Sequence, residues 1–223
     1  YDELEKNNKK VKVVYWDGEF NYSAINNFGA KYANGEYILL LNNDTEIINE
    51  DCLKELVSIC QREDVGCVGA RLLYEDDTIQ HAGVIVGLGG VAGHCFIGEP
   101  KDSGGYYNRI LCIQDYSAVT AACMMIKASV FRKVNGLSED LKVAFNDIDL
   151  CLKIRKLGYL VVYNPYAELY HFESKSRGLE NTPEKVERFN REVETFKSHW
   201  KEFLDKGDPC YNPNLSYTLK KIK

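Results

Sequence analysis

The chain has 223 residues, of which 45% are hydrophobic and 27% are charged, and its formal net charge is −5. These values are ordinary for a globular protein with one large domain, or one domain with a long extension. The acidic balance excludes nucleic-acid binding through bulk positive charge. No apolar run approaches the roughly 20 residues that a membrane-spanning helix needs.

The eight cysteines do not form a disulfide framework in this interpretation. They lie at positions 52, 60, 67, 95, 112, 123, 151 and 210, no two of them are arranged as C-x-x-C, and several lie in apolar segments such as residues 121–125. Buried, reduced thiols of this kind are typical of a cytoplasmic protein.

The first seventy residues alternate predicted strands with predicted helices. Strands are expected over residues 11–16, 37–41 and 65–73, and helices over residues 21–34 and 50–61, the second capped by Asn49. The inner face of the predicted helix 50–61 is expected to carry Leu53, Leu56, Val57 and Cys60. The continuous apolar run 37–41 predicts a strand buried on both faces, and the alternation predicts a parallel sheet built from βαβ units.

The second half begins with a glycine-rich stretch, residues 79–116, which predicts β-hairpins and loops over the sheet. A core strand is expected over residues 119–126 and a short helix over 129–135. A further helix is expected over 146–157 and a strand over 159–163. The last element is a long amphipathic helix over residues 183–206, with proline in its first turn and Gly207 at its end.

The first candidate site lies where the apolar run 37–41 ends in Asn42, Asn43 and Asp44. In open α/β sheets, ligands bind beyond the carboxyl ends of the strands. A carboxylate flanked by amides at that place can hold a hard divalent cation against a phosphate. The alternative is an Asx turn that simply ends the strand.

The second candidate site contains Asp147 and Asp149 at the start of the predicted helix 146–157, where the helix dipole favours carboxylates. Two residues apart, they cannot share one face of a helix. One carboxylate is therefore expected to face a cleft as a general base, and the other to cap the helix or form a structural pair. A capping role for both is the alternative.

The third candidate site is His171, which follows a strand-like segment and precedes Ser174, Ser176 and Arg177. Hydroxyl and guanidinium groups are suitable donors for phosphate oxygens. This combination favours a ligand-binding histidine over a purely structural one.

These three clusters, in this order, resemble the family 2 glycosyltransferases of the GT-A fold. Residues 20–27 and 34–37 match the helix that leads into the metal-binding strand of that family, and residues 69–74 and 80–83 are similar to its O-antigen and rhamnosyltransferase-like subgroup. The resemblance covers residues 11–215. It implies an α/β class with a mostly parallel sheet flanked by helices, a single glycosyltransferase domain over residues 1–215, and a tail over 216–223.

The resemblance also implies roles for individual residues. Asp44 and His171 would bind a divalent metal, Mn²⁺ or Mg²⁺, and Asp147 would be the catalytic base. Contacts to the nucleotide-diphospho-sugar donor would come from the remaining matched positions, Asn27, Asn42, Ser174, Ser176 and Arg177. Asn42 stands where the family's first aspartate is usual. The implied reaction is an inverting, in-line transfer to a glycan or lipid-linked acceptor, and a lipid-linked acceptor implies peripheral membrane contact.

Two other functions remain open from the sequence. A sugar-phosphate nucleotidyltransferase would also use a metal at strand ends, but its glycine-rich basic loop is not visible near the start of this chain. A non-catalytic carbohydrate-binding or assembly module could dock another domain through the helix 183–206.

His81, His94, Tyr106 and Tyr107 are candidates for acceptor contacts or for packing.

The family's first strand, with the acidic residue that binds the nucleobase and ribose, is missing ahead of Tyr1, so we expect a fragment of a longer protein. Without that part of the nucleotide pocket, this polypeptide is expected to bind sugar nucleotide weakly or not at all. Titration calorimetry with UDP and Mn²⁺ checks this, and micromolar affinity would contradict it.

Overall fold

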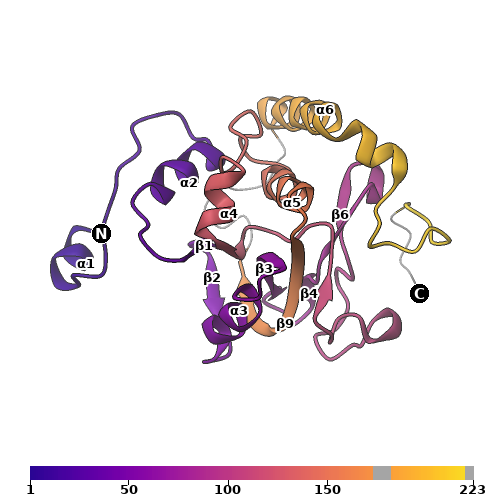
Figure 1. The fold of residues 1–223 in the computed structure, drawn as a ribbon, viewed down its shortest axis with the longest axis horizontal. Coiled ribbons are helices and arrows are strands. Elements are labelled where there is room, and N and C mark those ends of the chain that lie inside the picture. The colour runs from indigo at the N-terminus through magenta and orange to yellow at the C-terminus, as the bar shows by residue number, and fades with distance from the viewer. Residues whose placement is uncertain (173–181, 219–223) are drawn as a thin grey trace.

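The computed structural model describes residues 1–172 and 182–218 (Figure 1). A seven-stranded sheet has the order β1-β8-β3-β9-β2, with β4 paired to β3 and β7 paired to β9, and β5 and β6 form a separate hairpin. The strands are β1 (Tyr37–Leu41), β2 (Thr45–Ile47), β3 (Val65–Leu73), β4 (Ile79–His81), β5 (Val84–Val86), β6 (Ala92–His94), β7 (Gln114–Asp115), β8 (Cys123–Lys127) and β9 (Leu160–His171). The helices are α1 (Asp2–Asn7), α2 (Tyr22–Ala30), α3 (Cys52–Cys60), α4 (Ala128–Lys133), α5 (Asn146–Lys156) and α6 (Pro183–Lys206), with 3₁₀ turns η1 (Leu88–Gly90) and η2 (Tyr106–Asn108).

The predicted α/β class is confirmed, but the sheet is mixed where the sequence predicts a mostly parallel one. β3 and β9 run parallel, and the remaining pairs of the described sheet are antiparallel. A parallel neighbour needs a long crossover, usually a helix. β9 follows the helices α4 and α5, whereas β8 follows the hairpins and loops of residues 79–116 and returns antiparallel to β3.

β1 has the predicted bounds but not the predicted environment. It pairs antiparallel with β8 at one edge of the described sheet. Ile38 and Leu40 are buried, Tyr37 and Leu39 are half-buried, and Leu41 is exposed. The alternating burial corrects the prediction of a strand covered on both faces, because the apolar run alone does not distinguish an edge strand from a central one.

The predicted strand over residues 11–16 is wrong. These residues have no strand geometry. Their main-chain bonds are local: Val11 N–H donates to the Asn8 carbonyl (2.9 Å), and Val13 N–H donates to the Glu5 side chain (3.0 Å). β-branched residues favour a strand, but a strand forms only where a neighbour supplies the ladder of hydrogen bonds.

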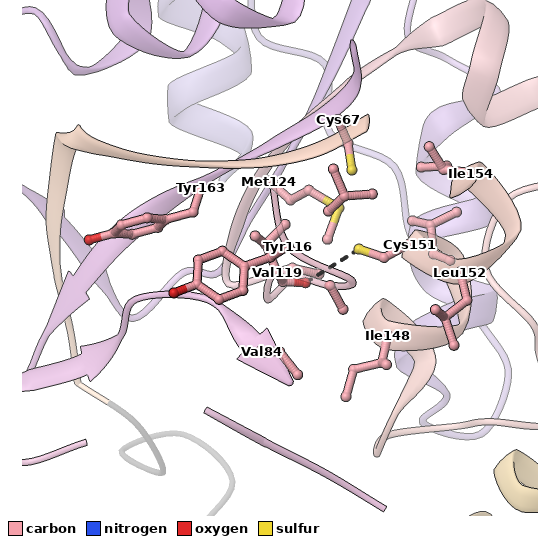
Figure 2. Close-up of a cluster of buried hydrophobic side chains, with 14 of the residues drawn as sticks. Cys67, Val84, Tyr116, Val119, Met124, Ile148, Cys151, Leu152, Ile154 and Tyr163 are labelled. Carbon is pink, nitrogen blue, oxygen red and sulfur yellow. Dashed lines mark hydrogen bonds between the residues drawn. The ribbon is translucent and has the colours of Figure 1, made fainter. Parts of the chain in front are cut away.

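Helices cover both faces of the sheet. On one face, α4, α5 and α6 pack with residues such as Ile38, Cys67 and Met124, whereas α3 packs on the other face against Val68 and Ala70. Figure 2 shows the first cluster, in which Ile148, Leu152 and Ile154 of α5 face side chains of the sheet. The Cys151 thiol donates to the Val119 carbonyl, 3.6 Å away. The predicted α5 and α6 are confirmed, α6 with the expected bounds.

α3 begins later than predicted because Asn49 does not cap it. The Asn49 amide instead binds β9, accepting from Glu168 N (2.9 Å) and donating to the Tyr166 carbonyl (2.9 Å). Cys52 consequently faces the core, and Leu53, expected inside, is 49% exposed.

α6 lies beside α5, on the face of the sheet opposite α3 (Figure 1). Its N-cap Thr182 accepts from Lys185 N (3.4 Å) and Pro183 follows at the first helical position, as predicted. The helix is interrupted at Trp200 (φ −120°, ψ 23°), whose indole N–H donates to Asp149 Oδ1 (2.9 Å). Among the described helices, including α6, none combines the length and apolar composition of a membrane span.

Gly69 provides a test of this packing. It lies on β3 between β8 and β9, and a Cβ built there would lie 2.5 Å from Val119 Cβ. We expect Gly69→Ala to lower the free energy of unfolding by about 1–3 kcal/mol through overpacking. Gly29→Ala is the matched control, because no atom outside the adjoining helix backbone lies within 4 Å of its added Cβ, and alanine has a higher helix propensity than glycine. Urea unfolding measures both, and equal effects would contradict the packing described.

Candidate functional site

The pairing of β2 with β9 brings Asp44 to His171. Thr45 lies opposite His171 in the antiparallel register, and Phe172 N–H donates to the Asp44 carbonyl (2.8 Å). The Thr45 hydroxyl donates to the Asn42 carbonyl (2.8 Å) and fixes the turn between β1 and β2. His171 Nε2 consequently lies 3.2 Å from Asp44 Oδ1 and 3.2 Å from Asn42 Nδ2.

Asp147 reaches the same region from the start of α5. Its Oδ2 accepts from Ala121 N (3.2 Å) and its Oδ1 accepts from Ile148 N (2.9 Å). The next residue, Ala122, accepts from Asn42 N (2.9 Å) through its carbonyl. The segment just before β8 therefore connects Asp147 to the turn that carries Asp44.

α6 holds the backbone ahead of Asp147. Glu192, which is 3% exposed, accepts from Val143 N (3.1 Å) and Ala144 N (2.9 Å). Phe145 follows in a left-handed conformation (φ +62°), and its ring packs on Phe196, 5.5 Å between centroids. A side chain with a positive φ is held there only by its surroundings. α6 thus positions the first turn of α5.

Tyr22, at the start of α2, lies near both aspartates and was not anticipated. Its hydroxyl lies 3.4 Å from Asn42 Oδ1 and 3.3 Å from the Ala121 carbonyl oxygen. Burial, and then the negative charges of Asp147 and Asp44, raise the pKa of Tyr22. The phenol therefore remains protonated and donates a hydrogen bond in the centre of the site.

Asp149 has the structural role that the spacing assigned to one of the two aspartates. It is 2% exposed, and it accepts from the Ser138 hydroxyl (2.6 Å) and from the Trp200 indole in addition to pairing with Lys153 Nζ (3.1 Å). These bonds tie α5 to α6 and leave Asp147 as the carboxylate directed to the site.

The structure does not bring every predicted residue to the site. The Asn27 amide binds the turn before α5, donating to the Leu137 carbonyl (2.9 Å) and accepting from Leu137 N (2.9 Å). These bonds secure α2 to that turn and involve neither Asp44 nor His171. Ser174, Ser176 and Arg177 lie outside the described residues.

His81 is a packed histidine and not the acceptor contact considered from the sequence. It is fully buried, and its Nδ1 lies 3.0 Å from Nδ1 of the half-buried His94. Thr120 N–H donates to its Nε2 (3.5 Å). Burial, followed by the proximity of His94 and His171, lowers the pKa of His81 well below 6.5.

Gln80, beside His81 on β4, is a site residue that the sequence analysis missed. It is 5% exposed, and its amide contacts the Nδ1 and the carbonyl oxygen of His171. The sequence holds a signal in the segment 80–83, which belongs to the family resemblance, but nothing in the spacing shows that Gln80 contacts a residue 91 positions away.

Asp44 and His171 fit a divalent cation. Asp44 Oδ1 is buried and accepts no hydrogen bond within the part of the chain that the structure describes. An unpartnered buried carboxylate oxygen is costly, and a cation beside it would remove that cost. Ligands about 2.1 Å from one octahedral ion lie roughly 3 Å apart when adjacent, close to the separation of this oxygen from Nε2. Within residues 1–172 and 182–218, no group of three His, Cys, Asp or Glu side chains is arranged around one ion, so other ligands would complete the shell.

Because His81 is buried in its neutral form, the free energy of unfolding should depend on pH. In the unfolded chain its pKa returns to about 6.5, so below that pH the unfolded state binds a proton that the folded state does not. The free energy of unfolding should therefore decrease from about pH 7.5 to about pH 5.5. Urea unfolding of the wild type and His81→Gln measures it, and the variant should show a shallower decrease. Equal decreases would contradict the assignment.

Known proteins with similar sequences point to one family. The family model described as Glycosyl transferase family 2 matches residues 1–134. The chain is 52% identical over 217 residues to the uncharacterized protein y4gI of Sinorhizobium fredii, covering 97% of this chain and 24% of that protein. It is 38% identical over 216 residues to the O-antigen biosynthesis protein RfbC of Myxococcus xanthus, covering 93% of this chain and 16% of that protein. The chain spans about a quarter or less of these relatives.

Two solved structures share the fold. A structure of GalNAc-T7 with UDP, GalNAc and Mn²⁺ superposes with a TM-score of 0.67 at 15% identity, over 91% of this chain and 40% of that one. The mannosyltransferase PcManGT from Pyrobaculum calidifontis, in complex with GDP-Man and Mn²⁺, superposes with a TM-score of 0.57 at 13% identity, over 91% of this chain and 50% of that one. The predicted GT-A fold is confirmed. Because the family model covers more than half of the sequence, the chain belongs to glycosyl transferase family 2.

Proposed function

We propose that this site transfers a sugar from a nucleotide-diphospho-sugar to a hydroxyl of a glycan or lipid-linked acceptor, with divalent-metal dependence and inversion at the anomeric carbon. The observation that carries the proposal is the unpartnered Asp44 Oδ1 beside His171 Nε2, with Asp147 connected to the same turn. The two similar structures, which hold Mn²⁺ with UDP and GalNAc or with GDP-Man, support it. The likeness to RfbC supports a role in polysaccharide synthesis.

Asp147 is the proposed general base. Two backbone N–H groups, of Ala121 and Ile148, orient its carboxylate. As the acceptor hydroxyl attacks the anomeric carbon, its proton passes to Asp147. A single displacement needs one base, whereas retaining hydrolysis needs a second carboxylate as a nucleophile.

The nucleotide side would lie at the Asp44 turn. Asp44 and His171 would hold Mn²⁺ or Mg²⁺, which supplies charge neutralisation to the leaving diphosphate. Asn42 offers its amide beside His171 Nε2, and Tyr22 keeps a protonated hydroxyl near Asn42. Ser174, Ser176 and Arg177 follow His171 closely in sequence and are proposed as phosphate contacts. Asn27 is proposed as a more distant residue on the donor side.

We place the reaction in the cytoplasm, with peripheral membrane contact where the acceptor is lipid-linked. The eight free cysteines support a reducing compartment.

Replacement of the two α5 aspartates separates catalysis from folding. Asp147→Asn keeps an oxygen acceptor for only one of the two N–H groups, of Ala121 and Ile148, and removes the base, so transfer should decrease by about 10²–10⁴-fold while the chain stays folded. Asp149→Asn removes the charge opposite Lys153 and should lower the free energy of unfolding by roughly 2 kcal/mol. Nucleoside diphosphate release from UDP-, GDP- and dTDP-sugars, with Mn²⁺ at saturating donor, measures transfer.

Two outcomes would contradict the proposal. Full transfer by Asp147→Asn would exclude Asp147 as the base. A folded wild type that binds a nucleotide sugar with Mn²⁺ and also binds glycans, yet releases no nucleoside diphosphate, would favour the carbohydrate-binding alternative.

A further inference from the structure

Gln80 is a buried polar side chain placed by an irregularity of the sheet. Leu72 of β3 lies opposite His81 of β4, but the next residue, Leu73, lies opposite Ile79, so the register passes over Gln80. An extra residue of this kind is a β-bulge, and bulges beside active sites redirect a side chain. The bulge allows Gln80 and His81 to be buried together, at 5% and 0% exposure, although they are neighbours on one strand.

The Gln80 amide holds His171 at two atoms. Its Nε2 donates to the His171 carbonyl (3.1 Å), and its Oε1 lies 2.7 Å from His171 Nδ1. A backbone carbonyl only accepts hydrogen bonds, so the amide group facing it must be the NH₂. Oε1 is consequently the atom that faces the ring, and His171 Nδ1 must carry the proton that Oε1 accepts.

This assignment determines the other side of the ring. A neutral imidazole with a proton on Nδ1 has a lone pair on Nε2. That Nε2 faces Asp44 Oδ1 and the Asn42 amide, each 3.2 Å away. Asp44 Oδ1 receives no hydrogen bond from any described residue. Two electron-pair donors therefore converge, which is the arrangement that a cation stabilises.

We propose that Gln80 is a positioning residue, which fixes the Nδ1–H tautomer and the ring orientation of His171 so that Nε2 acts as a cation ligand beside Asp44. The metal-binding part of this inference rests on the proposed function. Metal-ligating histidines depend on an acceptor at their second nitrogen, and loss of that acceptor typically reduces metal affinity by about 10–100-fold.

The test compares Gln80→Met, which has similar length but neither amide group, with the wild type. In metal-free protein labelled with ¹⁵N-histidine, at a pH where imidazole is neutral, His171 of the wild type should show the Nδ1–H tautomer. In Gln80→Met it should shift toward Nε2–H. The protein has four histidines, and the His171 signals are assigned by their loss in His171→Gln. The affinity for Mn²⁺ alone, measured by electron paramagnetic resonance, should decrease about 10–100-fold in Gln80→Met.

Two further variants separate positioning from folding. Gln80→Glu retains an oxygen acceptor for Nδ1–H and should retain the wild-type tautomer, even if Gln80→Met is unstable. Gln61→Met is the matched control, because Gln61 is exposed at the end of α3 and donates to the Ser58 carbonyl (3.2 Å) far from His171. It should leave both the tautomer and the Mn²⁺ affinity unchanged.

The outcomes distinguish this inference from the proposed function. An Nε2–H tautomer in the wild type, or an unchanged tautomer in Gln80→Met, would overturn the positioning role. An Nδ1–H tautomer that depends on Gln80, in a wild type that binds no Mn²⁺, would support the positioning role and reject the metal site of the proposed function.

Discussion

The site depends on the antiparallel pairing of the short strand β2 with the end of β9. This pairing places Thr45 opposite His171 and lets Phe172 N–H bind the Asp44 carbonyl, so that a carboxylate and an imidazole 127 positions apart lie within 3.2 Å. A register shift of one residue would turn the paired side chains to the opposite face of the sheet. The metal-binding proposal and the role of Gln80 both require this register.

The helices α5 and α6 position the part of the site that contains Asp147. Asp149, Glu192 and Trp200 form buried polar contacts that lock α6 onto α5 and onto the segment before it. Buried polar groups stabilise a unique arrangement only when each is hydrogen-bonded. The long helix that the sequence could assign merely to packing therefore helps to aim Asp147. The chain belongs to glycosyl transferase family 2 and spans about a quarter or less of the relatives y4gI and RfbC.

Element types were largely predictable because local rules decide them. The helix α5 follows from its 3.6-residue apolar pattern, and α6 from the same pattern with Thr182 and Pro183 at its start. Strand environment was less predictable. Residues 11–16 have strand composition but form no ladder, and β1 is an edge strand although its run is as apolar as a central one. Both depend on neighbours, which local sequence does not specify.

The sequence by itself determined which residues are the candidates for the chemistry: Asp44 after an apolar strand, Asp147 at a helix start, and His171 after a later strand. The motif order determined the family. Only the tertiary structure decided how these residues meet, that Asn27 binds the turn before α5 instead, and that Tyr22 and Gln80 join the site. The reason is physical: motif chemistry is written in adjacent residues, whereas contacts such as Gln80 with His171 arise from strand register and a bulge, which depend on the packing of the whole sheet.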